Sequence, residues 1–351
     1  MEIIIGKTAG FCFGVKNAVT KAEEALEQNE EIYCLGELVH NKQVTERLTQ
    51  KGMHFIDNIT EAKGKTVIRS HGVEKKTYKQ AENIKIDLID LTCPKVLHIH
   101  NIAEEYAKKV LAAYPLTTAE EYANGFNDHL TKSWIWGIKQ TEEQNMGDYS
   151  PFAMWYNGDR KCWTFACFIL SDQFVDLFDE GDIRFKQFER WAAGSGETKK
   201  EFWISHKFRD NEDCRGSMVV MRSDEMLLNA AEACAHQGKD AEAKALLWEL
   251  QDLRNAKRTE ASGGELIEAI LKERRKELYG EGFSLFDMLR TQKGLERTGN
   301  HLDWGGLITF PANSWRFIFQ LPGAEMKNNK SLVDEIWPAG DQNPFDGVYE
   351  P

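Results

Sequence analysis

The sequence changes character near residue 109, and this change limits what the chain can fold into. Up to Lys109, short β-branched runs alternate with amphipathic stretches, whereas from Val110 onward the chain is first rich in tryptophan and loop residues and then strongly helical. A chain of 351 residues is long enough for two or three domains, each with its own core. We therefore expect two structural parts, residues 1–109 and residues 110–351.

The first part is predicted to be an α/β lobe with a mostly parallel sheet. Amphipathic stretches predict helices, and short apolar runs predict strands. The expected strands are residues 2–6, 31–35, 66–69 and 86–91, and the expected helices are residues 16–28, 42–51 and 97–109. Strands that alternate with helices in this way are typical of a parallel sheet whose neighbouring strands are connected by helices.

Four side chains that can act as ligands follow these strands. Cys12, His40, His71 and Cys93 each lie just beyond a predicted strand or in the loop that leaves it. The carboxyl ends of parallel strands share one edge of a sheet, and open α/β sheets bind their ligands at that edge. Glycines on both sides of Cys12 permit a tight turn with free backbone N–H groups near the thiol.

Three interpretations of these four residues remain open. The cysteines can be small buried hydrophobic residues, with the histidines as ordinary loop residues. Alternatively, thiolates hold iron–sulfur clusters, and two thiolates with two imidazoles suit tetrahedral zinc. The long spacings make a weak zinc signature, because structural zinc sites usually contain closely spaced pairs. The convergence of all four residues on one edge favours a ligand site over simple burial.

The motifs around these residues resemble a known family. GFCFGV, GELVHN, VIRSHGV and DLTCPKV, which begin at residues 10, 36, 67 and 90, are similar to motifs of the LytB/IspH family of 4-hydroxy-3-methylbut-2-enyl diphosphate reductases. The resemblance implies a 4Fe–4S cluster on three cysteines, reduction of an allylic hydroxyl group, and electrons from ferredoxin or flavodoxin. It implies that Cys12 and Cys93 are cluster ligands and that His40 and His71 contact the substrate diphosphate.

The resemblance to the reductases stops at about residue 109. The family continues with two more α/β lobes that carry a further histidine, a glutamate that relays protons, and the third cluster cysteine. None of those motifs follows Lys109 in this chain. We therefore expect the N-terminal lobe to be incomplete, with no stably bound 4Fe–4S cluster and no reductase activity.

The second part is predicted to be mainly helical with long loops. Helices are expected at residues 222–237, 240–257 and 264–279, and the first two have the length and style of a tetratricopeptide helix pair. Alanines such as Ala230 and Ala231 would let the paired helices approach closely. The charged run from Glu273 to Glu277 is expected to form a solvated helix face with i,i+4 pairs.

Tryptophans are concentrated in the loop-rich stretch between residues 134 and 203. Each is expected to be a core residue, although an exposed indole face also suits the apolar face of a pyranose ring. The candidates for sugar stacking are Trp134, Trp155, Trp163 and Trp203.

This second part resembles the SusD/RagB family. The similar segments are RSDEMLLNAAEA from residue 222, LRNAKR from residue 253, ERRKELYGEGFSLFDMLR from residue 273 and FQLPGAEMKNN from residue 319. Members of that family are non-enzymatic, glycan-binding lipoproteins of the outer-membrane surface. The resemblance implies tetratricopeptide-type helix pairs that pack against a TonB-dependent transporter, and a loop-rich face for an oligosaccharide. The family's signal peptide, lipid-anchored cysteine and first helical repeats are not found before this segment.

Composition excludes some classes of function. A formal net charge of −12 disfavours nucleic-acid binding, because phosphate contacts need a basic surface. The odd number of cysteines, seven without regular spacing, fits a reduced compartment. No run of about 18 apolar residues predicts a membrane span. The first residues lack a signal-peptide pattern, so the chain as written is expected in the cytoplasm.

We interpret the chain as a chimera, because the two families work in different compartments. The leading hypothesis is SusD-type oligosaccharide binding by the C-terminal two-thirds, impaired by truncation. The alternative is an inactive reductase lobe that binds a metal or a diphosphate. The reductase-type lobe is expected to share little apolar surface with the helices, with a loose junction near residues 108–118.

Overall fold

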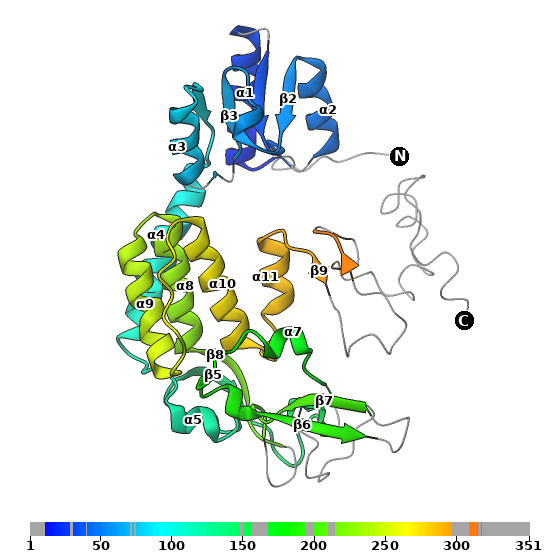
Figure 1. Ribbon diagram of the computed structural model, residues 1–351, viewed down its shortest axis with the longest axis vertical. Coiled ribbons are helices and arrows are strands. Elements are labelled where there is room, and N and C mark those ends of the chain that lie inside the picture. Colours follow the sequence, from blue (N-terminus) through cyan, green and yellow to red (C-terminus); the bar gives the residue numbers. More distant parts are fainter. Residues whose placement is uncertain are drawn as a thin grey trace, which may run out of the picture. The chain divides into compact units, whose positions relative to one another are not determined.

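The computed structural model describes residues 11–28, 31–39, 41–70, 72–73, 75–147, 150–155, 168–193, 200–209, 215–296, 309–312, 314 and 317. The chain divides into two compact units (Figure 1). The first comprises Met1–Ser284 with Gly299–His301, and the second comprises Leu285–Thr298 with Leu302–Pro351. Each unit is described by itself.

The first unit begins with a four-stranded parallel sheet in the order β2-β1-β3-β4. Its strands are β1 (Ile32–Leu35), β2 (Met53–Ile56), β3 (Thr66–Ile68) and β4 (Leu88–Asp90), and its helices are α1 (Phe13–Gln28), α2 (Lys42–Gln50) and α3 (Lys75–Asn83). A single 3₁₀ turn, Ile59–Glu61, precedes β3. This arrangement confirms the predicted α/β lobe, while the strand expected at residues 2–6 lies outside the described residues.

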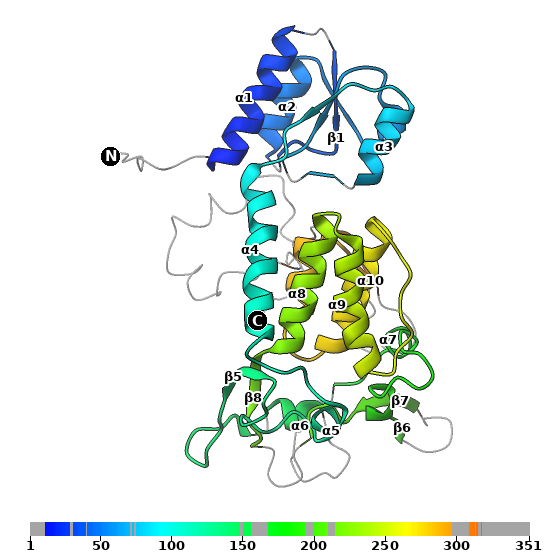
Figure 2. The same ribbon diagram turned by 90° about the vertical axis from the view of Figure 1, so that its left-hand side faces the viewer.

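Both faces of this sheet are covered (Figure 2). Successive residues of a strand point to opposite faces. Ile32 and Cys34 therefore join the core beneath α1 and α2, whereas Tyr33 and Leu35 pack toward α3. Helix α1 contributes a stripe of small residues, since Ala18, at 1% exposure, is one of several alanines at helical spacing that contact this core.

Helix α4 (Pro94–Leu111) runs unbroken through the boundary expected at residues 109 and 110. It starts earlier than predicted because Pro94 occupies the first helical position, where a missing N–H costs nothing. The same helix packs against α8 of the helical layer. Leu111, which lies beyond the expected boundary, joins the apolar cluster of that layer, and the expectation that residues 1–109 share little apolar surface with it stays a prediction.

The helical layer consists of α8 (Ser223–His236), α9 (Asp240–Leu253) and α10 (Gly264–Leu278), as predicted. Helix α8 packs against α4, α9 and α10, and the four helices run side by side in Figure 2. Ala230 and Ala231 are fully buried, which confirms the expected close helix crossing. Gly238, with a φ of 70°, makes the turn between α8 and α9 in a conformation that favours glycine.

Short elements and aromatic clusters occupy the loop-rich stretch between α4 and α8. Strand β5 (Trp134–Ile138) pairs antiparallel with β8 (Met218–Arg222), and β6 (Phe188–Ala193) pairs antiparallel with β7 (Lys200–Ser205). The short helices are α5 (Ala119–Ala123), α6 (Pro151–Trp155) and α7 (Asp172–Val175), with a 3₁₀ turn at Phe185–Gln187. The phenylalanines and tyrosines of this stretch form two separate cores.

The second unit carries most of α11 (Ser284–Arg290) and a small antiparallel pair, β9 (Leu295–Glu296) with β10 (Thr309–Phe310). The Arg290 guanidinium pairs with Asp287 one turn earlier in α11, at 2.7 Å. Within the described ranges, no helix combines the length and the apolar character needed to cross a bilayer.

Candidate functional sites

The loops that carry the reductase-type motifs meet at the carboxyl edge of the parallel sheet. The backbone N–H of Cys93, after β4, donates to the carbonyl of Ser70, after β3, at 2.8 Å. The Ser70 hydroxyl in turn donates to the carbonyl of Leu38, after β1, at 3.3 Å. Three motif segments are therefore joined side by side, as expected for the ends of parallel strands.

The fourth motif segment reaches the same place through Gly14. A Cβ atom added to Gly14 would overlap the Cys93 sulfur, so only glycine permits this close approach. Cys12, two residues earlier, is exposed, and its carbonyl accepts a hydrogen bond from Lys16 N–H at the start of α1. His40 and His71 lie outside the described residues. The segments of Cys12 and Cys93 thus converge, which agrees with the predicted shared edge.

The described cysteines do not supply the donor set of a 4Fe–4S cluster. Cys34 points into the sheet core, and burial raises the pKa of its thiol to about 12. Cys234 is buried in α8, where burial raises its pKa to about 11. Neither joins Cys12 and Cys93 at the sheet edge, and Cys162, Cys167 and Cys214 lie outside the described residues. Two thiols rather than three are available there among the described residues.

The tryptophans proposed for sugar stacking are mostly engaged with other residues. Trp134 is only 6% exposed and therefore offers no face to a sugar. Trp155 packs against Phe208 and Tyr279. Trp203 donates its indole N–H to Asp172 at 3.1 Å, and the Arg190 guanidinium lies 4.8 Å from its ring centroid. Trp163 lies outside the described residues.

Trp136, which was not among the candidates, presents an open indole. Its side chain is 58% exposed on β5, although residues two apart in a regular strand share one face. The register between β5 and β8 shifts between Trp134 and Trp136, and such a bulge turns the second side chain outward. Alternation alone would have placed both tryptophans on the same face, so the sequence contained no usable signal for this residue.

A second group, made of charged side chains, forms a buried network centred on Glu277 of α10. The fully buried Glu277 carboxylate accepts hydrogen bonds from Arg184, Arg222 and Arg254, with N···O distances of 2.9–3.0 Å. Burial by itself would raise its pKa, but the three guanidinium groups, Arg254 foremost, hold that pKa well below the usual range. The carboxylate therefore stays ionised inside the protein.

The wider network is balanced in charge. Its members are side chains at most 4% exposed, linked by hydrogen-bonded ion pairs. The five basic members are Arg184, Lys207, Arg222, Arg254 and Lys276, and the five acidic members are Asp182, Asp224, Glu273, Glu277 and Glu281. Equal numbers of opposite charges make such burial tolerable.

This network corrects the prediction for the charged run of α10. Glu273, Arg274 and Glu277 are each less than 5% exposed, whereas a solvated face was expected. The i,i+4 spacing of these residues is the same on a solvated helix face and in a buried ion-pair network. Their partners lie far away in the sequence, so the spacing could not distinguish the two. The network connects the loop-rich stretch to the helical layer, so we assign it a structural role.

A third polar group joins α4 to the turn between α8 and α9, and we call it the helix seam. The Glu104 carboxylate of α4 accepts hydrogen bonds from Lys108, Gln237 and Lys239, each at 2.7 Å. Burial alone would raise the pKa of Glu104, but these three hydrogen bonds lower it to about 2. Lys108 also donates to Glu242 of α9 at 3.1 Å.

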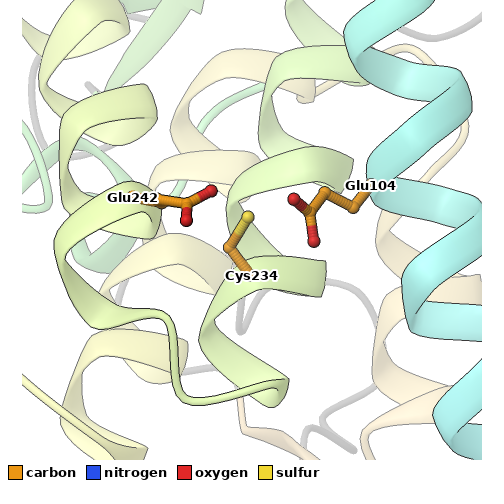
Figure 3. Close-up of side chains that lie close together, drawn as sticks. All are labelled: Glu104, Cys234 and Glu242. Atoms are coloured by element: carbon orange, nitrogen blue, oxygen red, sulfur yellow. The ribbon is translucent and has the colours of Figure 1, made fainter.

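Figure 3 shows Cys234 between the carboxylates of Glu104 and Glu242, an arrangement that could suggest a metal site. The three ligand atoms lie within 4.8 Å of one another. However, the Lys108 ammonium group already bridges both carboxylates, and Lys239 adds a second positive charge. These charges satisfy the acidic pair, so the seam is an ion-pair junction between helices.

Comparison with known proteins finds two families. The LytB protein family model matches residues 3–117, and the SusD family model matches residues 194–338. The first segment is 46% identical over 112 residues to the 4-hydroxy-3-methylbut-2-enyl diphosphate reductase of Alkaliphilus oremlandii, covering 31% of this chain and 40% of that protein. It is 44% identical over 115 residues to the same enzyme of Caldanaerobacter subterraneus, with the same coverage.

The helical part is similar to solved structures. A SusD-like carbohydrate binding protein from Bacteroides vulgatus is 30% identical, with a TM-score of 0.57, over 67% of this chain and 56% of that one. A SusD superfamily protein from Bacteroides thetaiotaomicron is 23% identical, with a TM-score of 0.55, over 66% of this chain and 56% of that one, and supports the fold alone.

The chain therefore joins parts of two protein families, a parallel α/β segment and a helical segment. The first is a LytB-type segment and the second a SusD-type segment, as the motifs predicted. The chain spans about 40% of the length of the curated reductases and 56% of the length of these SusD-like structures. The LytB match ends at residue 117, eight residues beyond the expected boundary and after the end of α4.

Proposed function

We propose that the SusD-type part of this chain binds an oligosaccharide. The observation that carries this proposal is the 30% identity and shared fold with a SusD-like carbohydrate binding protein over 67% of the chain. The helix pair α8 and α9 and the loop-rich stretch are both retained. The acidic net charge argues against nucleic-acid ligands but is compatible with neutral sugars.

Among the described aromatic residues of the loop-rich stretch, Trp136 is the most exposed and offers an open platform for such a ligand. Sugar rings stack their apolar face on an exposed indole, and Trp136 has the exposure that this needs. Trp203 would require Arg190 to move from its ring before a sugar could stack there. We therefore rank Trp136 ahead of Trp155 and Trp203 as the stacking residue.

A TonB-dependent transporter is the partner that the SusD resemblance implies. In that family the tetratricopeptide-type helix pairs contact the transporter. Here α4 of the reductase-type segment covers one face of α8. We propose that the transporter is bound more weakly than by the longer SusD-type proteins, because part of the helical surface is already occupied.

Calorimetry with the full chain and a panel of neutral oligosaccharides tests the carbohydrate proposal. We expect saturable binding to at least one glycan class and at least tenfold weaker binding for Trp136→Ala. Leu130→Ala, which changes another exposed apolar residue close to β5, is the control and should bind normally. Absence of binding by the unaltered chain at millimolar glycan would reject the proposal.

The convergence of the Cys12 and Cys93 segments favours a second candidate, a remnant diphosphate or metal binder. Anaerobic reconstitution with iron and sulfide, followed by absorption and EPR spectroscopy, tests whether a cluster forms. We expect no stoichiometric 4Fe–4S cluster, because the described donor set provides two thiols at this edge. A full cluster with turnover of 4-hydroxy-3-methylbut-2-enyl diphosphate would overturn this expectation, and Cys93→Ser would then identify the ligand.

A further inference from the structure

Two histidines stack across the contact between α4 and α8. The rings of His100 and His236 are nearly parallel, with an interplanar angle of 9° and 4.8 Å between their centroids. His100 is half-buried, and its Nδ1 atom is shielded from solvent without a hydrogen-bond partner. The His236 side chain is 37% exposed at the end of α8. The pair links a helix of the LytB-type segment to a helix of the SusD-type segment.

Charged groups surround this pair on every helix that packs there. Glu104 and Lys108 lie one and two turns further along α4, and both are engaged in the helix seam. On α8, the Glu232 carboxylate lies 3.7 Å from the His236 Nε2 atom. Cys234 of α8, Lys239 of the following turn and Glu242 of α9 lie at the adjoining helix seam.

A proton on His100 is therefore costly while α4 is docked. It would place a charge against the His236 ring in a half-buried contact, on a ring whose Nδ1 atom has no hydrogen-bond partner. Burial first, and then His236, lower the pKa of His100 below its ordinary value. Glu104 remains ionised throughout, because its pKa is about 2.

We propose that the His100–His236 pair makes the docking of α4 on α8 sensitive to acid. While His100 is neutral the two rings stack and α4 stays docked. As the pH falls, protonation of His100 puts a charge into this half-buried contact and loosens the junction between the two family segments. The sign follows from linkage. The undocked state takes up the proton more readily, so docking weakens by up to tenfold for each unit by which the pKa of His100 is depressed.

Hydrogen–deuterium exchange of the full chain at pH 7.5 and pH 5.5 tests this proposal. After correction for intrinsic exchange rates, we expect peptides from residues 98–112 to lose protection in acid. Peptides from residues 264–278 of α10 should keep theirs. In parallel, NMR titration of the histidine Cε1–H signals should give His100 a pKa below the ordinary 6.5. Equal protection of α4 at both pH values, or an undepressed His100 pKa, would overturn the proposal.

A variant pair separates the switch from a general loss of packing. His236→Asn keeps a polar side chain but removes the stacked ring, so the His100 pKa should rise and the loss of α4 protection in acid should become smaller, with the part that is due to burial of His100 remaining. His98→Asn changes an exposed histidine of the same helix and should leave the pH dependence unaltered. If His236→Asn already loosens α4 at pH 7.5, the NMR titration of His100 in the unaltered chain tests the proposal instead, and an undepressed His100 pKa there would overturn it.

Discussion

Replacing Glu277 by glutamine tests whether the buried charge network holds the SusD-type part together. The substitution keeps the shape of the side chain but removes its charge. Three arginines then lose their common ionised acceptor, and five buried cations face four buried anions. The new amide group also directs N–H donors toward guanidinium groups that can only donate.

The expected cost follows from the contacts that Glu277 makes. It accepts four charge-assisted hydrogen bonds, from three guanidinium groups that are fully buried. Removing one charged partner from a buried ion-pair group destabilises proteins by about 3–5 kcal/mol, because the remaining charges stay buried and uncompensated. For a folded region of this size, such a loss lowers the Tm by roughly 6–20 °C.

Thermal unfolding followed by far-ultraviolet circular dichroism measures this effect. The matched control is Glu105→Gln on α4, which removes an i,i+4 partner of Lys109 where both side chains are about 60% exposed. The control should leave the Tm almost unchanged, because exposed pairs contribute little. If Glu277→Gln and Glu105→Gln shift the Tm equally, the buried network does not stabilise the fold and this reasoning is wrong.

Three further results are expected. Cys12 is exposed and should be alkylated by iodoacetamide well before Cys234, whose burial raises its pKa to about 11, as peptide mass spectrometry would show. Gly14→Ala should destabilise the α/β lobe by about 1–3 kcal/mol, because the new Cβ overlaps the Cys93 sulfur, and urea unfolding would contradict this if the midpoint stayed constant. Burial lowers the pKa of Lys207 to about 8, so the unfolded chain binds this proton more readily than the folded chain does. The contribution of Lys207 to the free energy of unfolding should therefore rise between pH 8 and 10.5. Lys207→Met should remove this rise.

Much of the fold was predictable because its signals are local. The helices α8, α9 and α10 have long apolar stripes, and the parallel strands are short apolar runs followed by motif loops. Strand β2 and helix α3 were missed, since β2 has four residues that alternate only partly and α3 is a mostly polar stretch of nine residues. The early start of α4 was also missed, although Pro94 is a recognised signal for a first helical position.

The sites were less predictable because they depend on distant partners. The meeting of the segments that carry Leu38, Ser70 and Cys93 follows from the parallel strands β1, β3 and β4, so topology was enough to anticipate it. The burial of Glu273 and Glu277 depends on Arg184, Arg222 and Arg254, whose proximity no spacing rule indicates. The outward turn of Trp136 depends on a register shift that pairing with β8 creates. Local periodicity does not contain such long-range information.

Because α4 is continuous, its length sets how the LytB-type end of the helix is rotated relative to the SusD-type end. One end of this helix carries the Cys93 cap and the other carries Glu104 and Lys108. Each residue of an α-helix advances by about 100° and 1.5 Å, so inserting or deleting one residue between the two ends would turn one relative to the other by that angle. Inserting or deleting about seven residues, which make two turns, would keep the rotational orientation of one end relative to the other. The exact length of this helix is therefore a constraint on any gene rearrangement that joins these two segments.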